Sequence, residues 1–115
     1  MPDELAERRC RPCEGGVSPL PRAQALRLLE RLEAAWRISA DGKVLARRFE
    51  FPAYSRSVGF ANAVAWIAIA EGHHPELRVG YAHCEVRWTT FAIGGLSEND
   101  FICAAKTDRL VESAP

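Results

Sequence analysis

The sequence predicts an α+β fold: a four-stranded antiparallel sheet with helices on one face, in the order α-β-β-α-β-β-α. Two observations lead to this prediction. Four short segments alternate apolar with polar residues and pair off as two hairpins, and three longer segments have the apolar pattern of helices. Because each hairpin is followed by a helix, we expect antiparallel strands that bury one face of the sheet. The 115 residues are enough for one domain.

The first helix is expected to begin at Pro21, a residue suited to a first helical turn. Apolar residues then recur at the i, i+3, i+4, i+7 spacing of one helix face. These residues are Ala25, Leu28, Leu29 and Leu32. The pattern predicts an amphipathic helix of about three turns.

The first hairpin follows this helix. Trp36 and Ile38 alternate with polar residues, and Asp41-Gly42 is a tight-turn signal. Apolar side chains recur at even spacing in the second strand, at Leu45, Phe49 and Phe51. Alternation on both sides of a turn predicts two antiparallel strands.

The middle helix is predicted from Ser55 to Glu71, a length that fits only a helix. Residues Val58 to Ala70 are apolar except Gly59 and Asn62. One sheet face cannot cover a helix that is apolar on most sides, so we expect a homodimer or homotetramer. Gly72 is a natural end for this helix because glycine takes a positive φ without a Cβ penalty.

A second hairpin and a last helix complete the pattern. The alternating positions are Leu77, Val79 and Tyr81 in the third strand, and Cys84, Val86, Trp88 and Thr90 in the fourth. The run from Ser97 to Asp100 has the spacing of a capping box. It predicts a last helix that ends near Val111.

Residues 1–17 are charged and then glycine-rich, without apolar periodicity, which predicts a flexible N-terminal segment before a domain of residues 18–115. The segment holds Cys10 and Cys13, whose C-x-x-C spacing occurs in redox dithiols and in half zinc sites. A structural zinc needs four ligands, and no second ligand pair with zinc spacing follows. We therefore expect free thiols and no metal.

Charge and hydropathy exclude several classes of function. The 15 basic and 15 acidic residues give a net charge of +0, so no direct nucleic-acid ligand is expected. No apolar run approaches the ~20 residues of a membrane helix, and the N-terminus lacks an apolar signal region. We expect no membrane association and a cytoplasmic location.

A set of motif residues runs through the second half of the chain. In chain order these are His73, His74, Pro75, Tyr81, Gly95, Leu96, Ser97 and Asp100. The combination resembles the pterin-4a-carbinolamine dehydratases, also called dimerisation cofactors of a homeodomain transcription factor. The resemblance covers roughly Leu20 to Leu110, and the run from Asn99 to Lys106 is similar to bacterial members. It implies the fold predicted above.

The resemblance implies dehydration of 4a-hydroxytetrahydrobiopterin to the quinonoid dihydropterin, without metal or cofactor. This chemistry delivers one proton to the departing hydroxyl and removes another from a ring nitrogen, and imidazoles do either near neutral pH. The catalytic residues implied are His73, for acid/base work, and His74, which also binds substrate. The implied substrate-binding residues are His73, His74, Pro75, Thr90, Phe91 and Asp100.

The sequence departs from the family pattern at two places. Phe91 stands where the family has a third active-site histidine, and Ile69 stands where it has an acidic residue. Glu71 cannot replace the acidic residue at position 69, because two positions along a helix it points in another direction. His83 cannot replace the histidine at position 91, because it lies eight residues earlier, at the other end of the hairpin. Loss of one positioned acid/base group lowers a rate by ~10²–10⁴. The alternative is a catalytically weak or inactive pterin-binding, oligomerising adaptor; a role in molybdenum-cofactor metabolism rests on family analogy alone.

Overall fold

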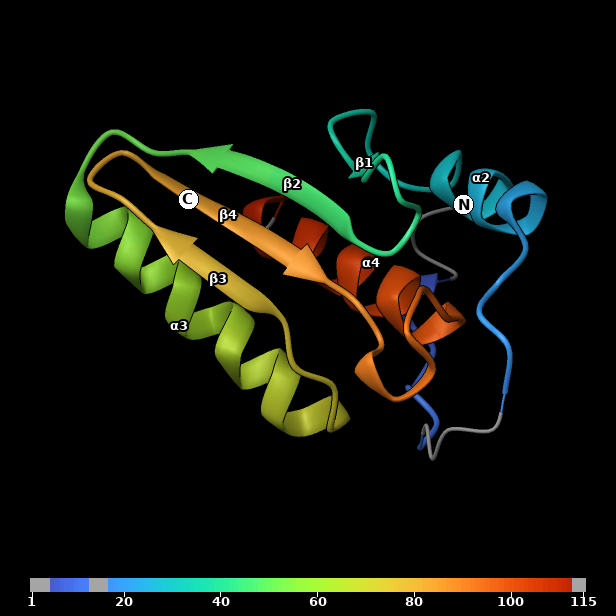
Figure 1. Cartoon of the computed structure of the whole chain (residues 1–115). Coiled ribbons are helices and arrows are strands. Elements are labelled where there is room, and N and C mark those ends of the chain that lie inside the picture. The colour runs from blue at the N-terminus through green and yellow to red at the C-terminus, as the bar shows by residue number, and fades with distance from the viewer. Residues whose placement is uncertain (1–4, 13–16, 113–115) are drawn as a thin grey trace.

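The structure is a computed structural model that describes residues 5–12 and 17–112. The helices are α2 (Arg22–Leu29), α3 (Tyr54–Glu71) and α4 (Glu98–Glu112), with the 3-10 turn η1 (Phe91–Ile93) between sheet and α4. The strands are β1 (Arg37–Ile38), β2 (Leu45–Glu50), β3 (Glu76–Val79) and β4 (His83–Trp88) (Figure 1). In these ranges no helix combines the length and apolar character needed to span a membrane.

The four strands form one sheet in the order β1-β2-β4-β3, and all neighbours are antiparallel. Helices α3 and α4 lie on the same side of this sheet (Figure 1). The strand side chains buried beneath them are Leu45, Phe49, Cys84, Val86 and Trp88. The predicted α+β class, with helices on one face, is confirmed.

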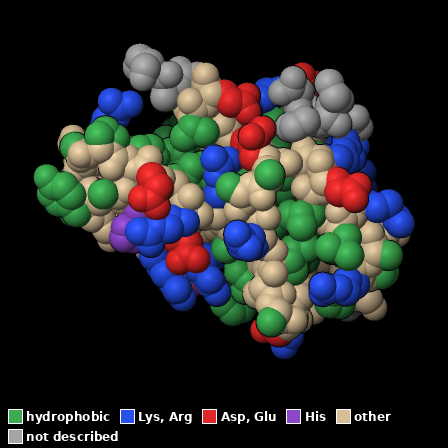
Figure 2. All heavy atoms as spheres, turned by 90° about the horizontal axis from the view of Figure 1, so that it is seen from above, with side chains coloured by type: hydrophobic (Ala, Val, Ile, Leu, Met, Phe, Trp, Pro, Cys, Tyr) green, Lys and Arg blue, Asp and Glu red, His purple; other side chains and the backbone are tan. Residues whose placement is uncertain are grey.

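The opposite face of the sheet carries charged side chains that form ion pairs across β3 and β4. Arg87 Nε lies 2.9 Å from Glu76 Oε1, and Arg78 Nη1 lies 3.6 Å from Glu85 Oε1. Acidic and basic side chains are also interspersed on the surface seen in Figure 2. Opposite charges face each other across neighbouring strands, which favours the strand pairing and lets this face of the sheet be exposed to water.

The first helix and hairpin are shorter than the sequence pattern predicts. Helix α2 ends at Leu29, and the chain tightens into a turn in which the Leu32 N–H donates to the Leu29 carbonyl over 3.1 Å. Strand β1 has two residues, and side-chain hydrogen bonds stabilise the loop that follows it. Asp41 Oδ1 accepts hydrogen bonds from the Ser39 hydroxyl at 2.6 Å and from the Lys43 N–H at 3.0 Å.

Helix α3 begins one residue before the predicted start and ends where expected. The side chains buried on its inner side are Ser57, Phe60, Ala61, Val64 and Ala68. Trp66 and Ile69 project from its other side, 71% and 68% exposed. The helix therefore keeps large apolar side chains that the monomer does not cover.

The third strand stops at Val79, so Tyr81 lies outside it and is 72% exposed. The reason is the tight connection to β4. The Gly80 N–H donates to the His83 carbonyl over 2.8 Å, and a Cβ on Gly80 would collide with the His83 ring. Any larger residue at position 80 would therefore require the His83 ring to move.

Residues 5–12 of the N-terminal segment pack against α3 and α4. Leu5 is fully buried, and Lys106 Nζ donates to the Ala6 carbonyl over 2.7 Å. Arg9 Nε lies 3.1 Å from Glu71 Oε2. These partners lie far away in the sequence, so local apolar periodicity gives no sign of the contact. Cys13 lies outside the described residues.

A buried polar group joins α4 to the first hairpin. Both carboxylate oxygens of Asp108 accept from Trp36 Nε1 at 2.9 Å, and Asp108 Oδ1 accepts from Arg47 Nη1 at 2.6 Å. Burial raises the pKa of Asp108, although these donors work in the opposite direction. The contact fixes the last turns of α4 against β2 and the residue before β1.

Candidate functional site

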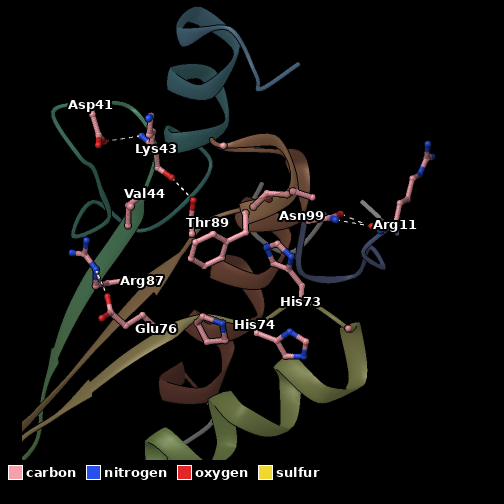
Figure 3. A pocket seen from close by; sticks show the side chains of 16 residues that line it. Arg11, Asp41, Lys43, Val44, His73, His74, Glu76, Arg87, Thr89 and Asn99 are labelled. Atoms are coloured by element: carbon pink, nitrogen blue, oxygen red, sulfur yellow. Dashed lines mark hydrogen bonds and ion pairs between the residues drawn. The ribbon is translucent and has the colours of Figure 1, made fainter. Parts of the chain in front are cut away.

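A pocket of about 880 Å³ opens between the β1–β2 loop, the end of α3, the end of β4 and η1 (Figure 3). Five of the side chains predicted to bind substrate line it: His73, His74, Pro75, Thr90 and Phe91. In Figure 3, the two histidines lie across the pocket from Lys43 and Val44. The fold thus brings together residues from three separate parts of the chain.

The end of α3 positions His73. Gly72 has a φ of 67°, and both the Gly72 and the His73 N–H groups donate to the Ala68 carbonyl. This left-handed residue turns the chain so that the His73 ring lies parallel to Trp88, with centroids 5.8 Å apart and planes at 8°. Only 9% of His73 is exposed. Its ring is therefore held in one orientation by packing on one side.

Asp100 holds the His73 ring on its other side. His73 Nε2 lies 2.6 Å from Asp100 Oδ1, while Asp100 Oδ2 accepts from Thr90 Oγ1 at 2.8 Å and from the Ser97 N–H at 2.9 Å. Asp100 is fully buried and is not among the residues that line the pocket. An ionised carboxylate only accepts hydrogen bonds, so His73 Nε2 is the donor of this contact when Asp100 is ionised. Nδ1 is then the ring nitrogen left for other partners.

The predicted capping box at the start of α4 is half formed. The Asp100 carboxylate accepts from the Ser97 N–H, as a capping box requires. The Ser97 hydroxyl instead lies 2.8 Å from Thr90 Oγ1. Thr90 Oγ1 thus accepts a hydrogen bond from the Ser97 hydroxyl and donates one to Asp100. These bonds join the end of β4 to the helix that carries the carboxylate.

The other predicted residues differ sharply from His73 in exposure. His74 is exposed beside its buried neighbour. Phe91, on η1, is 90% exposed. The pocket therefore has one fixed, buried imidazole and a more open wall that carries a second imidazole and an aromatic ring.

Three residues weighed from the sequence lie away from the pocket. Ile69 is exposed on α3. His83 is the first residue of β4, opposite Glu50 in the β2–β4 ladder, at the end of the strand away from the pocket. The Glu71 side chain turns towards the N-terminal segment, where Oε1 accepts from the Cys10 N–H at 2.8 Å. Burial opposes ionisation of Glu71, but the Cys10 N–H and nearby cations outweigh it and lower its pKa.

The polar rim of the pocket is not predicted from the sequence. Its members are Arg11, Asp41, Lys43, Glu76, Arg87 and Asn99. Asn99 holds the N-terminal segment in place: its side chain accepts from the Arg11 N–H at 3.0 Å and donates to the Arg11 carbonyl at 2.7 Å. Figure 3 shows this pair of contacts at one edge. Trp88 was also missed as a site residue, although strand alternation places it on the same face as Thr90.

The arrangement suits proton transfer to a small, flat, partly apolar ligand. The buried carboxylate fixes one imidazole nitrogen, and an imidazole is a good acid or base near neutral pH. In residues 5–12 and 17–112 no three His, Cys, Asp or Glu side chains lie close enough together to hold a metal ion.

The fold and the pocket define a class: a small α+β protein with a carboxylate-held histidine at a pocket sized for a small molecule. Residues 18–110 match the family model described as pterin 4 alpha carbinolamine dehydratase. The chain belongs to this family.

Two relatives whose names place them in the same family come from Nitrosomonas eutropha and Dechloromonas aromatica. The first is 54% identical over 110 residues, with 96% of each chain covered, and the second is 49% identical over 108 residues, with 94% of each covered. A solved structure from Brucella melitensis, described as a transcriptional coactivator/pterin dehydratase, has a TM-score of 0.76 at 26% identity. It covers 81% of this chain and 98% of its own.

Proposed function

We propose that the protein dehydrates 4a-hydroxytetrahydrobiopterin to the quinonoid dihydropterin, with His73 as the acid/base group. The observation that carries this proposal is the His73 ring between Trp88 and the buried Asp100, at the wall of the pocket. Membership of the dehydratase family supports it. The reaction needs no cofactor, because both of its proton transfers are within reach of imidazole chemistry.

His73 Nδ1 is the atom to which we assign proton transfer, since Nε2 is engaged with Asp100. In the protonated ring, Nδ1–H donates to the departing 4a-hydroxyl, and Asp100 stabilises the positive charge. The neutral ring can then accept the proton that leaves a pterin nitrogen. We assign Asp100 to positioning His73, since the carboxylate is buried and does not line the pocket.

His74 and Phe91 are assigned to binding the pterin. His74 is exposed and can donate to or accept from the substrate. Phe91 offers an aromatic face for stacking but no proton. We therefore propose a dehydratase that works with two imidazoles, at a rate below that of enzymes with a third.

The test is steady-state dehydration of enzymatically generated 4a-hydroxytetrahydrobiopterin, with the spontaneous reaction subtracted, for the unmodified protein, Phe91→His and His73→Ala. We expect turnover above background, a gain in Phe91→His and a loss of about 10²–10⁴-fold in His73→Ala. Equal rates for the unmodified protein and His73→Ala would overturn the assignment.

The second candidate function is a pterin-binding, oligomerising adaptor with little turnover. The observation that favours it is Phe91, an exposed aromatic ring in place of a proton-carrying group. An adaptor binds a pterin analogue and keeps its assembly state, and its background-level turnover is the same with and without His73. The same kinetic series, with pterin binding measured by calorimetry, separates the two functions.

We also propose that α3 joins copies of the chain into a homodimer or homotetramer. Trp66 and Ile69 lie one turn apart on its outer side and are mostly exposed. Light scattering after size exclusion measures the mass directly. We expect Trp66→Ser to shift it towards the 12.8 kDa monomer, while Glu30→Gln, an exposed change at the end of α2, leaves it unchanged. A monomeric unmodified protein would contradict this proposal.

A further inference from the structure

Two cysteine thiols that are far apart in the sequence lie together beside α4. Cys10 Sγ is 3.4 Å from Cys103 Sγ, across 93 positions of the chain. Cys103 is fully buried on the helix, whereas Cys10 is half-buried on the N-terminal segment. A disulfide has an S–S length of about 2.05 Å, so the two atoms need to approach by only about 1.4 Å.

The backbone around Cys10 is fixed at several points. Its N–H donates to Glu71 Oε1 over 2.8 Å, and the next residue, Arg11, is bonded through both its N–H and its carbonyl to the Asn99 side chain. Earlier in the segment, Lys106 Nζ holds the Ala6 carbonyl. The segment is thus attached to α3 and α4 on both sides of the thiol, and the pairing of the two sulfurs follows from this docking.

We propose that Cys10 and Cys103 are a reversible thiol–disulfide pair that locks residues 5–12 onto α4. The oxidant is a low-molecular-weight disulfide. The Cys10 thiolate attacks one of its sulfurs, which forms a mixed disulfide and releases one small thiol. The Cys103 thiol then loses its proton and attacks the Cys10 sulfur, and the second small thiol leaves. The protein gives up two electrons and two protons, and the small disulfide becomes two thiols.

Accessibility sets the order of these steps. Cys10 is half-buried whereas Cys103 is fully buried, so we expect the external disulfide to react with Cys10 first. The hydrogen bond with Cys10 and burial raise the pKa of Cys103, which keeps it a thiol until the mixed disulfide has formed beside it. Disulfides in reducing compartments are usually transient or redox-sensing, which fits a pair with one reachable sulfur.

Formation of the Cys10–Cys103 disulfide would restrain one edge of the pocket. Arg11 follows Cys10 directly, and Arg11 and Asn99 both line the pocket. The disulfide ties this edge covalently to α4 and closes a loop of most of the chain. Crosslinks over loops of this length stabilise a fold by limiting the unfolded chain, so we expect a rise in Tm on the order of 10 °C.

The experiment incubates the folded protein in buffers of oxidised and reduced glutathione, alkylates free thiols and maps peptides by mass spectrometry. Cys10 and Cys13 fall on one tryptic peptide because proline follows Arg11, so the central measurement uses Cys13→Ser. We expect this variant to form the Cys10–Cys103 crosslink in oxidising buffer, to lose it in reducing buffer and to show the rise in Tm.

Two variants separate this pair from other pairings. Cys10→Ser is expected to form no crosslink to Cys103 and to show no rise in Tm on oxidation. The proposal is overturned by a Cys13–Cys103 link that persists in Cys10→Ser. It is also overturned if Cys13→Ser forms the Cys10–Cys103 link only after urea unfolding, since the folded structure would then not direct the pairing.

Discussion

Replacing Asp100 with asparagine tests whether the buried carboxylate orients His73. In the structure two carboxylate oxygens accept from three donors at 2.6, 2.8 and 2.9 Å. An amide offers one oxygen and an NH₂ group, so at least one donor must face another donor. Loss of a charge-assisted hydrogen bond costs about 1.5–3 kcal/mol, and an unsatisfied buried donor adds about 1–3 kcal/mol. We expect Asp100→Asn to unfold about 4 kcal/mol more easily.

The effect on catalysis should be larger than the effect on binding. Without the carboxylate, His73 loses the acceptor that fixes its tautomer and the charge that stabilises its protonated ring. We expect kcat to fall by about 10²–10⁴, with little change in KM, because Asp100 is buried and does not line the pocket. Steady-state dehydration and urea denaturation, followed by tryptophan fluorescence, measure the two effects separately.

Two further variants make the result interpretable. Glu50→Gln changes an exposed carboxylate on the opposite sheet face and should alter stability by less than about 0.5 kcal/mol. Thr90→Val removes a single donor to Asp100 and is the milder change if Asp100→Asn fails to fold. Folded Asp100→Asn with the kcat of the unmodified protein would refute the positioning role.

Three other changes have expected outcomes. Gly72→Ala should cost about 1–2 kcal/mol in urea denaturation, because alanine is strained at a φ of 67°. Asp108→Ala should cost about 3–5 kcal/mol by the same assay, since it leaves the buried Trp36 N–H unsatisfied and the partly buried Arg47 charge without this carboxylate; a loss below 1 kcal/mol would contradict the network. The lowered pKa of Glu71 means that its contribution is present above its ordinary pKa of 4.5 and is lost as pH falls through the lowered value. Unmodified protein and Glu71→Gln should therefore differ in stability at pH 7 and converge in acid.

Local signals in the sequence predict most of the fold. Alternation in β4 identifies its buried side chains, and Gly72 marks the end of α3 because only a residue tolerant of positive φ continues the chain there. The motif at His73 and His74 also indicates the pocket. Each of these signals lies within a few residues of the feature that it predicts.

Contacts between distant residues could not be predicted in the same way. The half-buried Cys10 has its partners on α3 and α4, 61 to 93 positions away, so no local sequence signal indicates these contacts. Tyr81 continues the alternation of β3, yet the packing of His83 over Gly80 ends the strand before it. The contact between Asp100 and His73 joins residues 27 positions apart, so only the folded chain shows it.

The strand order β1-β2-β4-β3 also determines how this chain reaches its fold. Each hairpin closes over a short loop, but the central pairing of β2 with β4 joins residues about 40 positions apart, with α3 between them. Pairing across such a separation costs chain entropy before it returns any burial, and it slows folding compared with purely local contacts. The two hairpins can therefore form early and independently. The pairing of β2 with β4 is then the folding step that establishes the native strand order.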